Sequence, residues 1–284
     1  MTRVGLVLEG GAMRGLYTAG VLDVLMEENV LVDGIIGVSA GALFGLNYFS
    51  NQKGRALRYN KKYSKDLRFI SVLSLLLTGN LVNKSFAYYK VTKKLDPFDN
   101  DTYLKNNKDF YAVITNVKTG NPEYVKINDV YQDLEVIRAT SAMPLASRMI
   151  KINNELYLDG GITDSIPIAK MQEMHYDKII VVLTQPKDYR KEKLSLKKEN
   201  IIKRKFKKYP LLIDAMFKRP EKYNETIKKI IAMENKKEIF VIRPSKKLVI
   251  NIFDRNKEKM QEIYNVGVND TKKILKDLKK YLEK

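Results

Sequence analysis

Residues 33–44 read DGIIGVSAGALF, a short apolar run that ends at a serine and is followed by small residues. This order predicts a buried strand, a tight turn at Ser39 and a helix directly after it. Gly37 and Gly41 flank the serine in a Gly-x-Ser-x-Gly pattern. This pattern is typical of a tight strand-to-helix turn, which needs small neighbours and projects the serine side chain outward. Free N–H groups at a helix N-terminus also favour developing negative charge. Ser39 is therefore a candidate nucleophile, and a serine that caps an ordinary helix is the alternative.

A glycine-rich loop precedes this segment. Residues 3–8 alternate like a strand and run into Glu9-Gly10-Gly11-Ala12-Met13-Arg14-Gly15, after which residues 15–28 carry apolar side chains at helical spacing. Adjacent glycines let backbone N–H groups converge on one point, which suits an anion or a tetrahedral oxyanion. The pattern is neither Gly-x-Gly-x-x-Gly nor a Walker loop, so it does not indicate a nucleotide site. The loop is a candidate oxyanion hole, with a plain strand-to-helix turn as the alternative.

The rest of the chain continues the alternation of strands and helices. Sequence patterns predict hairpins at 109–127 and 149–159, strands at 178–183 and 238–242, and helices at 52–95, 131–142 and 167–174. Without a linker or repeat, we expect one α/β domain over residues 1–284, with a mostly parallel sheet covered by helices on both faces. Its motif-bearing core would be residues 3–185, and residues 186–284 would form a helical, Lys-rich extension.

The second hairpin ends in Asp159-Gly160-Gly161. Alone, an aspartate before two glycines predicts an ordinary turn. Together with Ser39 and the glycine loop it completes a set of nucleophile, oxyanion donors and carboxylate, each at the end of a predicted strand. Open α/β sheets place their sites at the carboxyl ends of strands, so we expect the three features at one edge of the sheet.

The order of these motifs resembles the patatin-like phospholipases. The resemblance covers residues 3 to about 185, and it includes the segment 139–144, Ala-Thr-Ser-Ala-Met-Pro, which is similar to a stretch ahead of that family's catalytic aspartate. It implies a three-layer α/β/α fold, with Ser39 as the nucleophile and Asp159 as the base that deprotonates it directly. It also implies an oxyanion hole formed by a loop of five residues: Gly10, Gly11, Ala12, Arg14 and Gly15.

Two positions depart from the common family pattern. Glu9 stands where aspartate is often found, and Ala12 replaces a third glycine. An alanine adopts a positive φ only with strain, so we expect the oxyanion hole to survive if φ at Ala12 is negative. For Arg14 we expect a structural role, tying the loop to a carboxylate or to backbone carbonyls, with contact to substrate as the alternative.

The composition favours a dyad over a triad. The chain has no cysteine and a single histidine, His175, which precedes the predicted strand 178–183 and so lies at the amino end of that strand. Ser39 follows its strand at the carboxyl end, the opposite edge of a parallel sheet. The expected mechanism has two steps: Ser39 attacks the ester carbonyl, and water activated by Asp159 then releases the acid. It requires no metal and no cofactor.

The chain carries 52 Lys and Arg against 33 Asp and Glu, a formal net charge of +19. Codon bias toward lysine, an anionic membrane and nucleic acid are the competing explanations. Lysine greatly outnumbers arginine and no nucleic-acid motif is present, so we do not expect a nucleic-acid partner. The segment from Lys187 to Lys208 holds 11 basic against 3 acidic residues. It predicts peripheral contact with an anionic membrane, and a solvated charge run is the alternative.

Membrane insertion is not expected from this sequence. The N-terminus lacks a signal-peptide pattern, and the longest apolar stretch, residues 69–77, is too short to span a bilayer. We expect that stretch to be a core helix, with an acyl-channel wall or a lid as alternatives. The protein would then be soluble and cytoplasmic, with peripheral contact at the inner membrane surface.

The function these residues favour is acyl-ester hydrolysis, and the family resemblance adds a lipid substrate. We therefore expect a phospholipase A or lysophospholipase that acts on membrane lipids. A short-chain carboxylesterase or thioesterase is one alternative. A non-catalytic protein whose glycine loop binds an anion or a lipid is another.

Overall fold

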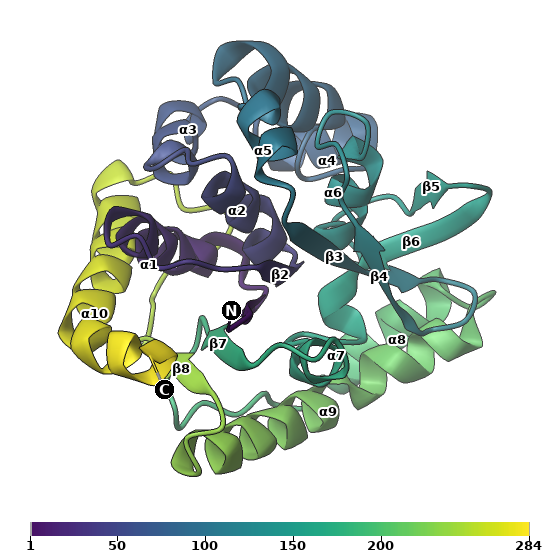
Figure 1. The fold of residues 1–284 in the computed structure, drawn as a ribbon. Helices are drawn as coiled ribbons and strands as arrows, with labels where there is room; N and C mark the ends of the chain where they lie inside the picture. Colours follow the sequence, from purple (N-terminus) through teal and green to yellow (C-terminus); the bar gives the residue numbers. More distant parts are fainter. Residues whose placement is uncertain (1, 284) are drawn as a thin grey trace.

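The computed structural model describes residues 2–283 and contains an eight-stranded mixed sheet (Figure 1). Hydrogen-bonded neighbours in the sheet follow the path β5-β6-β3-β2-β1-β7-β8, and β4 pairs with β3 in addition. Neighbours along β3-β2-β1-β7-β8 are parallel, whereas β4, β5 and β6 pair antiparallel. The strands are β1 (Val4–Leu8), β2 (Gly34–Val38), β3 (Asp109–Asn116), β4 (Pro122–Lys126), β5 (Ile150–Ile152), β6 (Glu155–Asp159), β7 (Lys178–Val182) and β8 (Phe240–Ile242).

Helices cover both faces of the sheet, so the predicted three-layer α/β/α fold is confirmed. One layer contains α1 (Gly15–Glu27), α2 (Ala40–Phe49), α6 (Leu134–Thr140) and α10 (Lys257–Glu283), and the other contains α7 (Ile168–Glu173) and α9 (Pro210–Asn235). Alternate side chains of β1 explain the two layers: Leu6 and Leu8 join the first apolar cluster, and Val7 joins the second. The remaining elements are η1 (Ala12–Arg14), α3 (Arg55–Tyr63), α4 (Val72–Thr78), η2 (Lys84–Leu95), α5 (Asn100–Asn106), η3 (Gly160–Ile162) and α8 (Leu196–Lys205).

The C-terminal part of the chain is built into the sheet and its helical layers. Strand β8 lies parallel to β7, with Val241 opposite Val181. Helix α10 packs along α1 (Figure 1), and two glycines permit the close contact. A Cβ atom on Gly20 would lie 2.2 Å from the Tyr264 carbonyl oxygen, and one on Gly267 would lie 2.1 Å from that of Tyr17. Each position therefore excludes any larger residue at this helix–helix distance.

The predicted strands are all present, but three helical predictions need correction. Helix α6 begins at Leu134 rather than 131. Before it, Asp129 and Asp133 accept hydrogen bonds from backbone N–H groups of residues 128–131 and hold these residues in turns. The stretch 69–77 is not a core helix: α4 leaves Leu76 and Leu77 78% and 75% exposed.

The basic segment from Lys187 to Lys208 also differs from the prediction. It is helical only over α8, and residues 186–195 form no helix or strand. No helix within residues 2–283 is long and apolar enough to cross a membrane.

Candidate active site

Strands β2 and β6 meet end to end on the same edge of β3. Val38 of β2 pairs with Val113, and Asp159 of β6 pairs with the next residue, Ile114. Strand β4 already occupies the other edge of β3 at Ile114, so β6 must share the edge that β2 uses. Since β2 and β6 run in opposite directions, their carboxyl ends face each other. This topology brings Ser39 and Asp159 together.

Ser39 occupies a strained strand-to-helix turn. Its backbone has φ +52° and ψ −123°, a conformation that costs a non-glycine residue on the order of 1–3 kcal/mol. The neighbouring glycines are sterically required: a Cβ on Gly37 would lie 2.6 Å from the Ala42 Cα atom, and one on Gly41 would lie 2.6 Å from the Leu8 carbonyl oxygen. The fold therefore maintains this conformation by close packing around the serine, as the Gly-x-Ser-x-Gly pattern predicted.

Asp159 is 7% exposed and faces hydrogen-bond donors and cations. Its Oδ1 atom accepts a 2.7 Å hydrogen bond from the Gly161 backbone N–H. Burial raises the pKa of Asp159 above its usual value; the Arg219 charge, the Gly161 N–H group and a hydrogen bond from the Ser39 side chain oppose this rise. The net effect is a carboxylate that is more basic than an exposed aspartate.

The segment 139–144 accepts hydrogen bonds from the backbone of both Ser39 and Asp159. The Ser39 backbone N–H donates to Thr140 Oγ1 at 3.0 Å, and the Asp159 backbone N–H donates to the Ala142 carbonyl at 2.9 Å. The segment resembles a stretch of the family in sequence, but its local sequence does not indicate a role for Thr140. Because each contact fixes backbone rather than side chain, the segment sets the relative position of the two strand ends.

The glycine loop lies directly against Ser39. A Cβ on Gly10 would be 3.2 Å from the Ser39 Cβ atom. Within residues 2–283, the backbone N–H groups of Gly10, Gly11 and Ala12 donate no hydrogen bond to the protein. The condition of a negative φ at Ala12 is not met, since its φ is +47°. Ala12 adopts the left-handed conformation that glycine would adopt without strain.

Glu9 is buried and holds the start of the glycine loop through hydrogen bonds. Its carboxylate is 2% exposed and accepts hydrogen bonds from the Thr184 backbone N–H at 2.5 Å and the Tyr223 hydroxyl at 2.9 Å. Burial raises the pKa of Glu9, and these two donors oppose the rise. Neither Thr184 nor Tyr223 was predicted, because nothing in their local sequence indicates that they face residue 9.

Arg14 was expected to tie the loop to a carboxylate or to backbone carbonyls, and the first of these two contacts is not formed within the described residues. Within the described part of the chain it forms no salt bridge within 4.0 Å, and its Nε atom is buried without a hydrogen-bond partner. Arg14 instead lines a cavity beside Ser39, together with Lys191 and Arg219. Sequence analysis missed the latter two because they do not stand out among 52 basic residues.

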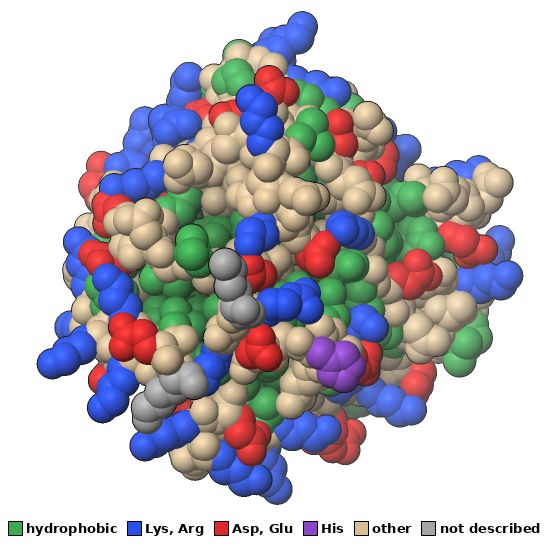
Figure 2. Space-filling model, viewed as in Figure 1, with side chains coloured by type: hydrophobic (Ala, Val, Ile, Leu, Met, Phe, Trp, Pro, Cys, Tyr) green, Lys and Arg blue, Asp and Glu red, His purple; other side chains and the backbone are tan. Residues whose placement is uncertain are grey.

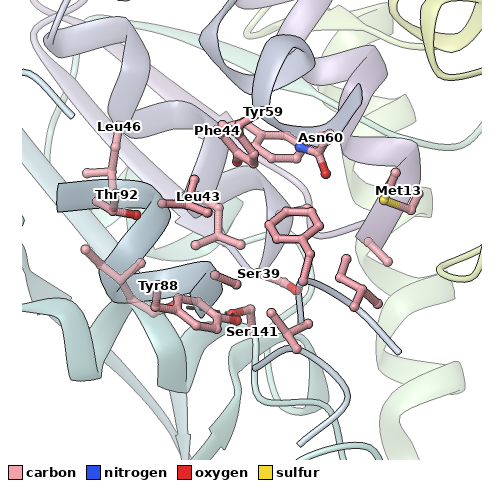
Figure 3. A pocket seen from close by; sticks show the side chains of 18 of the residues that line it. Met13, Ser39, Leu43, Phe44, Leu46, Tyr59, Asn60, Tyr88, Thr92 and Ser141 are labelled. Carbon is pink, nitrogen blue, oxygen red and sulfur yellow. Dashed lines mark hydrogen bonds between the residues drawn. The ribbon is translucent and has the colours of Figure 1, made fainter. Parts of the chain in front are cut away.

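Two cavities meet at Ser39, one lined mainly by apolar side chains and one that combines apolar with charged side chains. An apolar pocket of about 130 Å³ extends between α2, α3 and η2; Figure 3 shows Ser39 among the side chains that line it, including Leu43, Phe44 and Tyr88. A larger cavity of about 560 Å³ contains Asp159, the glycine loop and the three cations. Among residues 2–283, only Ala12, Ser39 and Met143 line both. An ester held at Ser39 would therefore have an apolar space on one side and, on the other, a larger space that contains the charged side chains.

His175 lies far from this site. It precedes β7, whose first residue, Lys178, pairs with Val4 at the start of β1, whereas Ser39 follows the other end of the neighbouring strand β2. Its side chain is exposed and is the purple group in Figure 2. The sheet thus separates the one histidine from the serine, as predicted.

The sequence matches the model of the patatin-like phospholipase family over residues 6–171, more than half of the chain. The chain belongs to the patatin-like phospholipase family. A second match, to a domain of unknown function (DUF6363), covers residues 209–283 of this patatin-like protein. That second segment contains α9, β8 and α10.

Several known proteins resemble this patatin-like chain. YjjU of Escherichia coli strain K12, named an uncharacterized protein, is 32% identical over 189 residues, which are 65% of this chain and 52% of YjjU. Lysophospholipase NTE1 of Meyerozyma guilliermondii is 26% identical over 186 residues, 63% of this chain and 12% of that enzyme. The match thus spans about half of the first relative and a small part of the second. The crystal structure of VipD from Legionella pneumophila covers 98% of this chain and 67% of its own, with 12% identity and a TM-score of 0.48.

Proposed function

We propose that this protein is a lipid acyl hydrolase that uses Ser39 as nucleophile and Asp159 as base. The observation that carries the proposal is the meeting of β2 and β6 on β3, which places a strained serine beside a buried carboxylate. The raised pKa of Asp159 supports its role, because a more basic carboxylate is better able to accept a proton from a serine hydroxyl.

The reaction proceeds in two steps. Asp159 accepts the Ser39 hydroxyl proton while Oγ bonds to the ester carbonyl carbon; the ester C–O bond then breaks, and the alcohol leaves with that proton. In the second step, Asp159 takes a proton from water, whose oxygen attacks the acyl-enzyme carbonyl. The acid leaves and Ser39 recovers its proton.

The glycine loop is the proposed oxyanion hole. The unpaired N–H groups of Gly10, Gly11 and Ala12 lie in the loop that packs on Ser39, and such donors stabilise the negative charge of a tetrahedral intermediate. Gly15 lets the helix that follows pack against the nucleophile's own helix, since a Cβ there would lie 2.7 Å from the Ala40 Cβ atom. The loop can therefore remain close to the reacting carbonyl.

The apolar pocket favours an apolar acyl group over a polar one. Its lining is dominated by aromatic and aliphatic side chains, and it opens directly on Ser39. The lysophospholipase name of the NTE1 relative points the same way. We propose phospholipase A or lysophospholipase activity on this basis.

Peripheral membrane contact is a further part of the proposal. Helix α4 exposes Leu76 and Leu77 next to Phe69 and Ile70, which line the apolar pocket. Helix α8 adds an exposed Leu196 within the predicted basic segment. Exposed apolar side chains combined with lysines are typical of contact with an anionic bilayer, here at the inner membrane surface.

Sedimentation with lipid vesicles tests this membrane contact. Leu76→Asp should reduce co-sedimentation with anionic phosphatidylglycerol vesicles, whereas Leu31→Asp, at an equally exposed position before β2, should not. Equal sedimentation of both variants would contradict this contact.

Covalent labelling with a fluorophosphonate probe tests the chemistry. We expect the wild-type protein to be labelled, Ser39→Ala to lose the label, and Asp159→Asn to label on the order of 10²-fold more slowly or worse. His175→Ala is the control and should label normally. A folded wild-type protein that takes no label would overturn the hydrolase proposal, and loss of labelling in folded His175→Ala would overturn the dyad.

A further inference from the structure

The larger of the two cavities at Ser39 is walled by the C-terminal part of the chain. Lys191 and Arg219 line it together with Arg14 and the glycine loop. These three side chains come from η1, from the segment between β7 and α8, and from α9. The cavity therefore exists only because elements far apart in sequence converge on the nucleophile.

The three cations are close enough to disturb one another. The pKa of Lys191 is lowered to about 8, mainly by burial and also by the charges of Arg219 and Arg14, while those of Glu9 and Asp159 act in the opposite direction. Such a shift means that the protonated lysine is poorly compensated by the protein alone. An anion bound among the cations would relieve this repulsion.

The carboxylates in the cavity do not neutralise these cations by direct contact. Within residues 2–283, none of Arg14, Lys191 and Arg219 has a carboxylate oxygen within 4.0 Å. The Nε atoms of Arg14 and Arg219 are buried and lack any hydrogen-bond partner in the same residues. A buried donor without a partner is unfavourable, so the protein leaves the hydrogen-bonding capacity of both guanidinium groups incompletely satisfied.

The cations are held in position rather than free to move. Asn224 of α9 clamps the Lys191 backbone, accepting from its N–H at 2.8 Å and donating to its carbonyl at 3.0 Å. The Lys191 ammonium lies 4.5 Å from the centre of the Tyr223 ring. Arg219 lies against Gly161, where an added Cβ would be 3.2 Å from its Nη2 atom. This preorganisation is what a binding site for a small anion requires.

We propose that Arg14, Lys191 and Arg219 form a phosphate-binding subsite beside Ser39. The inference rests on the proposed function for its placement: with the acyl chain in the apolar pocket, the leaving alcohol would extend toward the three cations. A phosphate group attached to that alcohol would meet donors on several sides, with the planar guanidinium groups suited to its oxygens. The substrate would then be an acyl ester of a phosphorylated alcohol. A free phosphate ion has the same chemistry and could occupy the same subsite.

Hydrolysis of two esters that differ only in phosphate tests the subsite. The pair is 1-palmitoyl-lysophosphatidylglycerol and 1-palmitoylglycerol, presented in the same neutral detergent micelles. We expect Lys191→Met and Arg219→Met each to lower the ratio of kcat/KM for the phosphate ester to that for the neutral ester about tenfold or more. The matched control, Lys218→Met, changes an exposed neighbour of Arg219 and should leave the ratio unchanged.

Inorganic phosphate separates the two sources of the group. Millimolar phosphate should inhibit hydrolysis of the neutral ester by wild type, but less so in Lys191→Met. If phosphate inhibits and the variants lower the kcat/KM ratio, the subsite binds the phosphate of the substrate. If phosphate inhibits and the variants leave that ratio unchanged, the subsite binds free phosphate. A ratio and an inhibition constant that neither variant alters would overturn the subsite.

A binding experiment tests the phosphate subsite independently of the proposed hydrolase activity. If wild type cleaves neither ester, phosphate binding by the folded Ser39→Ala protein, measured calorimetrically, still reports on the subsite. Binding that weakens in the Ser39→Ala, Lys191→Met double variant supports the subsite without the hydrolase, and no binding in Ser39→Ala overturns it.

Discussion

The Tyr223 hydroxyl on α9 donates a 2.9 Å hydrogen bond to the buried carboxylate of Glu9, the residue that starts the glycine loop. This contact joins the part of the chain matched by the patatin-like family to the segment matched by the domain of unknown function. The proposed oxyanion hole thus depends on the C-terminal region for its support. The same helix also supplies Arg219, so α9 contributes to both the loop and the cavity.

Removal of this hydroxyl should destabilise the protein. In Tyr223→Phe, one oxygen of Glu9 loses its donor inside the core, which should lower the free energy of unfolding by about 1–3 kcal/mol. Urea denaturation followed by circular dichroism measures the change. Tyr189→Phe is the control, since Tyr189 packs against Tyr223 edge to face but its hydroxyl forms no hydrogen bond in the described residues. Equal stability of Tyr223→Phe and wild type would contradict the importance of the contact.

The strain at Ser39 predicts an unusual order of stabilities. Both Ser39→Ala and Ser39→Gly remove the nucleophile, but only glycine adopts φ +52°, ψ −123° without a steric penalty. We expect the glycine variant to be more stable than the alanine variant by about 1 kcal/mol. The reverse order in thermal or urea unfolding would show that the turn is not strained in solution.

The acid limb of the pH–rate profile should reflect Asp159. The base must be ionised, and burial raises its pKa, so activity should fall on acidification at a higher pH than the ordinary aspartate value of about 3.9. Hydrolysis of a neutral ester as kcat/KM against pH measures this limb. In Arg219→Met the limb should move to still higher pH, because the Arg219 charge helps to keep Asp159 ionised. A limb at the ordinary value would argue against a buried catalytic carboxylate.

The alkaline limb should depend on the substrate. Loss of the Lys191 proton above pH about 8 removes a positive charge from the cavity, so kcat/KM should fall there for the phosphate ester but not for the neutral one. Lys191→Met should abolish this difference. Identical alkaline limbs for the two esters in wild type would contradict the role of Lys191. The groups that face Lys191 and set its titration are Glu9, Arg14, Asp159, Arg219 and Tyr223.

The contact between α1 and α10 leads us to propose that residues 1–284 fold as one unit. Gly20→Ala would place a Cβ atom 2.2 Å from the Tyr264 carbonyl, so the helices must separate and stability should fall by about 1–3 kcal/mol. Far-ultraviolet circular dichroism and tyrosine fluorescence should report one coincident urea transition, shifted as a whole in the variant. Two separate transitions, with only one shifted, would divide the chain into independent domains.

The local sequence was sufficient for the strands and for the strained turn. Apolar runs such as 34–38 and 178–182 can only be buried in a sheet, and Gly37 and Gly41 mark a position where backbone atoms approach closely. It was also sufficient to place His175 at the edge of the sheet away from Ser39, because strand direction follows from the order of elements. It could not determine the sign of φ at Ala12, because the packing of the loop against Ser39 and Thr184 imposes that sign.

Tertiary structure alone determined the partners of the site. No local pattern indicates that β6 continues the edge of β3 used by β2, although this is what brings Asp159 to Ser39. Periodicity marked residues 69–77 as apolar but could not show that α4 has no layer above it. Lys191 and Arg219 differ from dozens of other basic residues only in where α9 and its preceding segment place them. Burial and mutual repulsion depend on that placement, so the sequence by itself identified the proposed nucleophile and base, and the fold decided what surrounds them.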